Sequence, residues 1–193
     1  MERTLVLIKP DGVKRGLIGE IITRFEKVGL KIVACKMVWP DKELIAKHYP
    51  MDRIEWVKQL GQKSIDSYKS YGKDIKQIYG TDDLEQIGRQ VCLWLMGYLT
   101  LGPVVVLLLQ GHRAIDLVRK MTGNTIPALA NPGTIRGDLS LDAKDLADSL
   151  KRPLYNLVHA SGNTEEAQYE EKLWFKPEEI FDYKRAGEEI MYG

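Results

Sequence analysis

The sequence predicts an α+β fold in which a four-stranded antiparallel sheet is covered by helices. Short, uninterrupted apolar runs are typical of buried strands, and they lie far apart in this chain. Between them, apolar residues recur at the spacing of amphipathic helices, and glycines follow several of these stretches. The expected order is strand–helix–strand, several helices, strand–helix, a loop, and strand–helix. This order is the split β-α-β pattern of a ferredoxin-like sheet.

Four segments are expected to form the strands: residues 3–9, 30–39, 104–110 and 155–159. The first is apolar on both faces, as expected of a central strand. In the second, the odd-numbered positions from Val33 to Trp39 share one face. Pro10-Asp11-Gly12 follows the first strand and predicts a turn.

The expected helices cover residues 18–25, 41–49, 82–99, 112–121, 141–151 and 163–174, and residues 51–100 are helical in pieces separated by Gly61, Gly72 and Gly80. Asn163 followed by Glu166 fits a capping pair at the start of the last of these helices. Residues 124–139 are rich in proline and glycine, which predicts a loop. We find no internal repeat or flexible linker, so the prediction is a single domain.

Composition restricts the possible functions. The chain has 193 residues with a formal net charge of +1, so it carries no strong overall field to attract nucleic acid or an anionic membrane. An anionic ligand must therefore be held by a local group of Lys and Arg. Two cysteines are too few for a disulfide framework, which favours reduced thiols and a cytoplasmic location.

One apolar stretch, residues 91–109, approaches the length of a membrane span. Gly102-Pro103 divides it, and the second half has the β-branched composition of a buried strand. We therefore expect the end of a buried helix followed by a strand, with a membrane span as the alternative.

Two cationic residues lie where they could meet a phosphate. Lys9 comes directly off the first strand, and its alternative role is a solvated lysine beside a turn. Arg136 lies between Thr134 and Asp138 in the stiff segment NPGTIRGD, and a guanidinium suits phosphate because it is planar and forked. Its alternative role is a structural pair with an aspartate. Arg119 lies at a helix end, where exposed arginines are common.

His159 ends an apolar strand and is followed by small residues, which leaves room for a substrate. An imidazole can accept a phosphoryl group near neutral pH if its second nitrogen is held by a partner. Glu170 in the next helix is a plausible partner, and Ser161 could assist. The alternative is a histidine with a purely structural role.

Several segments together resemble the nucleoside diphosphate kinase family. They are ERTLVLIKPDGVKRGLIGEII, HY at 48–49, GPVVVLLL, NPGTIRGD, NLVHASGN and KLWFKPEEI, and they occur in the family's order. The resemblance covers nearly the whole chain. It implies a ping-pong phosphotransferase that moves the terminal phosphate of a nucleoside triphosphate to a nucleoside diphosphate through a phosphohistidine, in a ferredoxin-like fold. It also implies a homo-oligomer, either a hexamer or a tetramer.

The resemblance implies a role for each matching residue. His159 is phosphorylated, Glu170 orients its ring, and Ser161 lies beside them. Lys9 reaches the phosphates and the ribose hydroxyls. The remaining roles are Tyr49 beside the transferred phosphate, Arg119, Thr125 and Arg136 on the phosphates, and Asn156 on the 3′-hydroxyl of the sugar. Mg²⁺ is expected to bridge two phosphates with few protein ligands, so no metal-ligating residue is assigned.

Three departures from the family pattern stand out. The position of the family's base-stacking aromatic aligns with Glu55, so the neighbouring Trp56 is the candidate for stacking. Gly162 replaces an aspartate. Two insertions are expected, at about residues 53–99 and 140–153, and we expect the first to form helices that cover the nucleotide cleft or a subunit contact.

Two other functions remain possible: a silent regulatory member that binds nucleotides, and a phosphohistidine donor to other proteins. The presence of His159, Lys9 and Arg136 argues against the first. No feature of the sequence separates the second from nucleotide turnover. Membrane and nucleic-acid partners are not expected.

One further expectation concerns the backbone. Asn156 and His159 are three residues apart, so a regular strand would point them to opposite faces. The roles implied by the resemblance need both in one cleft, so we expect an irregularity at Leu157 or Val158. The alternative is a regular strand with Asn156 packed behind the sheet.

Overall fold

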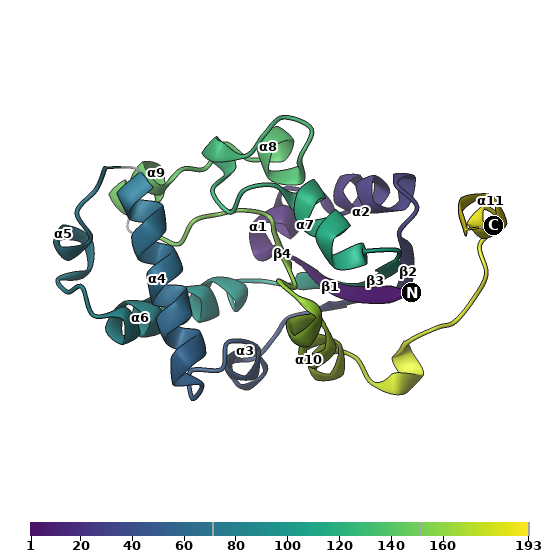
Figure 1. Ribbon diagram of the computed structural model, residues 1–193, viewed down its shortest axis with the longest axis horizontal. Coiled ribbons are helices and arrows are strands. Elements are labelled where there is room, and N and C mark those ends of the chain that lie inside the picture. Colours follow the sequence, from purple (N-terminus) through teal and green to yellow (C-terminus); the bar gives the residue numbers. More distant parts are fainter. Residues whose placement is uncertain (71, 151, 193) are drawn as a thin grey trace. The chain divides into compact units, whose positions relative to one another are not determined.

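The computed structural model describes residues 1–70, 72–150 and 152–192. They divide into two compact units, one formed by Met1–Pro40 with the chain from Gly102 onward, and one formed by Asp41–Leu101. Figure 1 labels the elements along the chain.

The first unit is built on a four-stranded sheet with the order β2-β3-β1-β4, in which every neighbouring pair is antiparallel. The strands are β1 (Glu2–Ile8), β2 (Lys31–Val38), β3 (Val104–Gly111) and β4 (Val158–Ala160). This order confirms the predicted ferredoxin-like fold. It also confirms β1 as a central strand, since Leu5 to Ile8 are fully buried on both faces.

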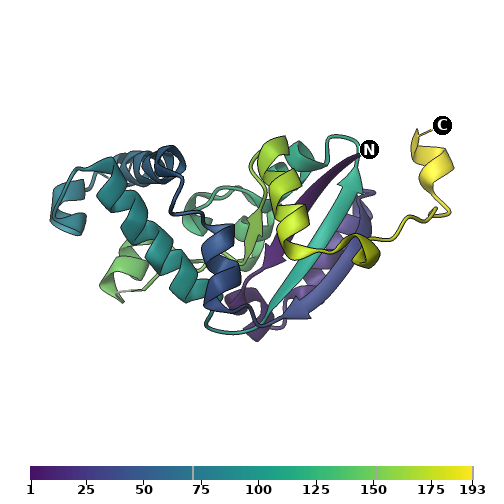
Figure 2. The same ribbon diagram turned by 90° about the horizontal axis from the view of Figure 1, so that it is seen from below.

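Helices cover both faces of this sheet. Figures 1 and 2 show α2 (Ile18–Lys27) and α7 (Ala114–Thr122) on one face and α10 (Thr164–Trp174) on the other. The main core lies under α2 and α7, where Val6 and Ile8 of β1 pack with Phe25 and Leu107. Asn163 caps α10 by accepting a hydrogen bond from the Glu166 amide, as predicted.

Shorter elements complete the first unit: α1 (Pro10–Lys14), the 3-10 helix η1 (Pro127–Leu129), α8 (Ile135–Leu139), α9 (Lys144–Ser149), the 3-10 helix η2 (Pro177–Glu179) and α11 (Glu188–Tyr192). The turn predicted at Pro10-Asp11-Gly12 is wrong, because these residues begin helix α1. Proline is compatible with the first helical position, where no backbone donor is needed. The helix predicted at 141–151 is shorter, and its last residue, Lys151, lies outside the described residues.

The second unit is helical: α3 (Lys42–His48), α4 (Ile54–Ser70), α5 (Ile75–Tyr79) and α6 (Leu84–Leu99). The expectation that helices form within residues 53–99 is therefore confirmed. A break at Gly61 is wrong, because this residue lies inside α4. Gly72 and Gly80 do interrupt the helices, with φ angles of +65° and +72° that suit glycine.

Two glycines let α4 and α6 approach each other through their backbones. A Cβ on Gly61 would lie 2.1 Å from the Leu84 carbonyl oxygen, and one on Gly88 would lie 2.0 Å from that of Val57. Side chains of any size are excluded at such distances, so the pair of helices depends on both glycines.

We expect Gly88→Ala to lower the free energy of unfolding by about 2 kcal/mol or more, because the added methyl group overpacks the contact between α4 and α6. Gly97→Ala in the same helix is the control, since a Cβ there meets no atom within 4 Å. It should stabilise the helix by up to about 1 kcal/mol. Urea unfolding of both variants measures the difference, and equal midpoints would contradict the close approach.

The apolar stretch at residues 91–109 ends α6 and then forms β3, on either side of Gly102-Pro103. Within the described ranges, no helix has both the length and the apolar character needed to cross a bilayer.

Candidate active site

A tight turn leads into strand β4. Leu157 has a φ of +66°, and the Val158 amide donates a 2.7 Å hydrogen bond to the carbonyl of Asn156. A bond between residues i and i+2 around a residue of positive φ is a γ-turn of the rare, strained kind. Such a conformation costs about 1–3 kcal/mol at a bulky residue. The predicted irregularity is confirmed, and it explains why β4 begins at Val158 instead of Tyr155.

Contacts from β1 and α1 hold the central residue of this turn. The Leu157 amide donates to Oδ2 of Asp11 at 3.1 Å, and its carbonyl accepts from the Lys9 amide at 2.7 Å. Asp11 was not among the predicted site residues, because the Lys-Pro-Asp-Gly motif indicated only a turn. An aspartate in the first turn of a helix after a proline is a signal that could have drawn attention to it.

Arg136 binds this turn through main-chain carbonyl groups. Its Nε donates to the Asn156 carbonyl at 3.1 Å, and its two terminal nitrogens donate to the carbonyls of Gly123 and Val158, each at 2.8 Å. The side chain is buried, with 7% exposed. Three charge-assisted hydrogen bonds to main-chain oxygens thus fix the residues on both sides of Leu157.

The alternative role for Arg136 was a structural pair with an aspartate. For the neighbouring Asp138 this alternative is wrong. That carboxylate accepts from Arg24 at 2.6 Å and from the Gly133 amide at 2.7 Å. These bonds hold the pKa of Asp138 below its ordinary value, the amide contributing most. The stiff loop predicted from NPGTIRGD is therefore fixed by a pair that does not involve Arg136.

Lys9 and Asn156 are joined by a hydrogen bond within the site. The ammonium of Lys9 donates to Oδ1 of Asn156 at 2.7 Å, and Nδ2 of Asn156 donates to the Thr125 carbonyl at 2.8 Å. Lys9 is only 5% exposed, so the alternative role of a solvated lysine beside a turn is wrong. The pKa of Lys9 is lowered to about 7, mainly by burial and also by the nearby charge of Arg136, while Asp11 acts in the opposite direction.

The low pKa of Lys9 makes stability depend on pH. An unfolded lysine has a pKa of about 10.4. Between pH 7 and 10 the unfolded chain therefore binds more protons at this residue, and its contribution to stability rises with pH. From pH 7 to 9 we expect a gain on the order of 2 kcal/mol in wild type relative to Lys9→Met. Urea unfolding at both pH values tests this, with the exposed Lys172→Met as control.

If Lys9→Met and wild type change stability in parallel between pH 7 and 9, the lowered pKa is contradicted. A difference that appears equally in Lys172→Met would assign the effect to net charge instead of burial.

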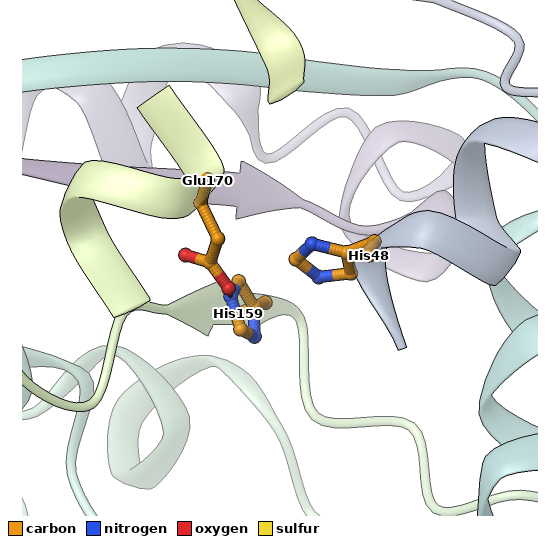
Figure 3. Close-up of side chains that lie close together, drawn as sticks. All are labelled: His48, His159 and Glu170. Atoms are coloured by element: carbon orange, nitrogen blue, oxygen red, sulfur yellow. Dashed lines mark hydrogen bonds and ion pairs between the residues drawn. The ribbon is translucent and has the colours of Figure 1, made fainter. Parts of the chain in front are cut away.

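His159 is held by a carboxylate from α10. Nε2 of its ring lies 2.8 Å from Oε1 of Glu170, and Figure 3 shows Glu170 projecting from its helix toward the ring. The second oxygen of Glu170 accepts from the Ser161 hydroxyl at 2.6 Å. Ser161 is fully buried, and its Oγ accepts from the Leu5 amide at 3.2 Å. Glu170 is thus fixed by the sheet, and the His159 side chain keeps 19% of its surface exposed.

The other predicted residues are placed as follows. Arg119 and Thr125 are exposed in the first unit, at the end of α7 and just before η1. Tyr49 and Trp56 belong to the second unit, where their rings lie 6.2 Å apart and are tilted by 33°. Glu55, the residue that aligns with the family's aromatic, has an exposed side chain.

Gly162, where the family pattern has an aspartate, faces a carboxylate from α10. Its amide donates to Oε2 of Glu166 at 2.7 Å, and a Cβ at this position would lie 2.6 Å from that same oxygen. A larger residue at this position would have to displace the Glu166 carboxylate, which is the far end of a flexible side chain.

The assembled site holds a histidine with one ring nitrogen fixed, a buried lysine and a buried arginine, which is the set of groups that phosphate chemistry requires. The family model for nucleoside diphosphate kinase matches residues 2–59 and 68–180. The chain belongs to the nucleoside diphosphate kinase family. A member of this family is a phosphotransferase that moves the terminal phosphate of a nucleoside triphosphate to a nucleoside diphosphate.

Curated nucleoside diphosphate kinases resemble the chain over nearly its full length. One from Pyrobaculum aerophilum is 49% identical over 94% of this chain and 99% of its own length. Another, from Borreliella burgdorferi, is 36% identical over 97% of this chain and 95% of its own length. Both predicted insertions lie within the matched stretch of each relative.

Solved nucleoside diphosphate kinases share the fold. The Pyrobaculum aerophilum enzyme has a TM-score of 0.87 at 48% identity, covering 94% of this chain and 99% of that one. A structure from Borrelia burgdorferi, described as a transition-state mimic with bound vanadate and ADP, has a TM-score of 0.76 at 37% identity, covering 97% and 94%. One from Halobacterium salinarum in complex with CDP has a TM-score of 0.70 at 31% identity, covering 100% and 99%.

Proposed function

We propose that the enzyme works in two half-reactions through a phosphorylated His159. The observation that carries this proposal is the bond between Nε2 of His159 and Glu170, which is itself held by Ser161. A carboxylate favours a proton on Nε2, and the lone pair of the ring then lies on Nδ1. Nδ1 attacks the terminal phosphorus of a triphosphate, and the bond from that phosphorus to the bridging oxygen breaks, which releases the diphosphate. A terminal oxygen of a second diphosphate then takes the phosphoryl group and restores the histidine.

The cationic groups would stabilise the charge that spreads over the phosphoryl oxygens during transfer. We assign Lys9 to the phosphates and ribose hydroxyls, and Arg119, Thr125 and Arg136 to the phosphates. Burial of Lys9 and Arg136 supports these roles, because charges act more strongly away from water. Since Arg136 also donates to three carbonyls, part of its role is to fix the turn.

The sugar and the base would be held by different groups. Asn156 is assigned to the 3′-hydroxyl, and its bond to Lys9 supports a place beside the phosphates. Tyr49 is assigned to the transferred phosphate, and Trp56 to stacking on the base. Stacking on an indole accepts any base, so we expect weak discrimination among bases.

Mg²⁺ is the cofactor we propose, held mainly through the nucleotide. Mg²⁺ takes oxygen ligands, whereas the buried charged groups beside Asn156 are the cations Lys9 and Arg136. These residues fit the phosphates that would carry the ion. When bound, Mg²⁺ supplies further neutralisation of phosphate charge.

We also propose a single domain with insertions at about 53–99 and 140–153, a homo-oligomer that is a hexamer or a tetramer, and a cytoplasmic location. Exposed apolar residues on the edge strand β2 and just beyond it, Met37 and Trp39, support association with another subunit. Cys35 and Cys92 are both free thiols, which supports a reducing compartment.

The test of the proposed function is incubation with γ-labelled ATP and Mg²⁺, followed by quenching in alkali and in acid. We expect acid-labile, alkali-stable label on the protein, which a second nucleoside diphosphate removes as labelled triphosphate. Initial rates should give parallel double-reciprocal plots. Intersecting plots, or an unlabelled protein that still transfers phosphate, would refute the phosphohistidine.

A further inference from the structure

An ion pair joins the two ends of the second predicted insertion, residues 140–153. Arg152 donates to both carboxylate oxygens of Asp142, at 2.6 and 2.9 Å, on the two sides of helix α9. The guanidinium also lies 4.2 Å from the ring centroid of Tyr155. Asp142 is only 5% exposed. A bidentate pair in a buried setting is a strong and directional contact.

The same aspartate also accepts hydrogen bonds from two segments outside the insertion. Its Oδ2 accepts from the Tyr155 amide at 2.6 Å, and its main-chain carbonyl accepts from the Ala128 amide in η1 at 3.0 Å. The Tyr155 carbonyl in turn accepts from the Ser140 hydroxyl at 3.2 Å. Asp142 therefore fixes Tyr155 and η1 with respect to each other.

Both of these segments continue directly into the site. Asn156 follows Tyr155, and Thr125 lies just before η1. The two segments meet where the Asn156 side chain donates to the Thr125 carbonyl, and the other end of that side chain accepts from Lys9. A shift of either segment would move the Asn156 amide away from Lys9.

We propose that Asp142 is a positioning residue for the sugar-binding part of the site, which it fixes by joining the segments that present Asn156 and Thr125. The proposal rests on the function assigned to Asn156 above. It gives the second insertion a role in the reaction, although Asp142 itself touches no reacting group. Its effect should fall on recognition of the 3′-hydroxyl and leave the phosphorylation of His159 by a donor without a sugar intact.

The experiment compares the phosphoenzyme's reaction with ADP and with 3′-deoxy-ADP. A site that binds a hydroxyl discriminates strongly against an analogue that lacks it. The measured quantity is the second-order rate constant with ADP divided by that with 3′-deoxy-ADP. We expect Asp142→Ala to lower this ratio at least tenfold, mainly by slowing the reaction with ADP. Asp142→Asn keeps one carbonyl oxygen for the Tyr155 amide, so it should give a smaller decrease. Asp145→Ala, an exposed acidic residue of the same insertion, is the matched control and should leave the ratio unchanged.

Two further measurements separate positioning from a general loss of structure. Phosphoramidate phosphorylates His159 without a nucleotide, and the rate of that labelling should be the same in Asp142→Ala, Asp142→Asn and wild type. In Asn156→Ala the ratio should already be low, and adding Asp142→Ala should lower it no further, because both changes act through one side chain.

An unchanged ratio in Asp142→Asn and Asp142→Ala, with normal labelling by phosphoramidate, would overturn the proposal. Additive effects of Asp142→Ala and Asn156→Ala would overturn it as well. A wild-type protein that phosphoramidate labels but ATP does not would refute the proposed function instead, and this outcome is distinct from the other two.

Discussion

Replacing His159 with alanine is expected to lower nucleotide phosphotransfer by several orders of magnitude while nucleotides still bind. The reaction loses its nucleophile, which is the imidazole that Glu170 holds through Nε2. Binding should persist, because Lys9 and Asn156 are fixed by contacts that do not include the imidazole. Turnover is measured with ATP and a second diphosphate, and affinity by calorimetric titration with ADP.

His112→Ala is the matched control, since this histidine is exposed and lies just before α7. It should retain wild-type turnover and wild-type affinity. Wild-type turnover in His159→Ala would show that another residue is the nucleophile. Loss of ADP binding together with turnover would show that His159 mainly holds the site together.

Replacing Arg136 with methionine is expected to lower both stability and activity. Three main-chain carbonyls, two of them in buried bonds, lose a charged donor at once, although that of Asn156 keeps its bond from the Val158 amide. A hydrogen bond to a charged group contributes about 1.5–3 kcal/mol, so the loss of three such bonds should lower the free energy of unfolding by about 3 kcal/mol or more. Turnover should fall at least about a hundredfold, because a positioned donor of the site is removed. Urea unfolding and steady-state rates measure the two effects.

Two comparisons sharpen this prediction. Arg113→Met removes an exposed arginine whose ion pair with Asp116 should contribute less than about 1 kcal/mol. Arg136→Lys keeps the charge but cannot donate in three fixed directions, so it should recover only a small part of the stability. Full recovery with lysine would mean that charge alone matters at this position.

The sequence allowed the sheet and its central strands to be predicted because apolar character is a local property. The turn at Leu157 was predictable too, since two residues three positions apart were required on one side of the chain. The helical start at Pro10 was not, because proline and glycine indicate a turn and a first helical turn equally well. The role of Gly61 inside α4 was not predictable either, because this glycine is needed for the close packing of α6. The contact lies near Gly88, 27 residues further along the chain.

Among site residues, those that could be predicted carry their function in the side chain itself. His159, Lys9 and Arg136 belong to residue types that suggest phosphate chemistry. Asp11 and Asp142 could not be found in this way. Each is an ordinary acidic residue until the fold brings a distant amide, that of Leu157 or Tyr155, to its carboxylate.

The γ-turn at Leu157 also has an evolutionary consequence. Asp11 and Arg136 recognise it through main-chain amides and carbonyls, which every residue except proline presents in the same form. A substitution at residue 157 therefore cannot create a new partner for an altered Asp11 or Arg136. Residue 157 can drift among side chains that fill the core and tolerate a positive φ, whereas residues 11 and 136 cannot covary with it. A search for second-site suppressors of Arg136 variants should accordingly yield none within residues 156–158.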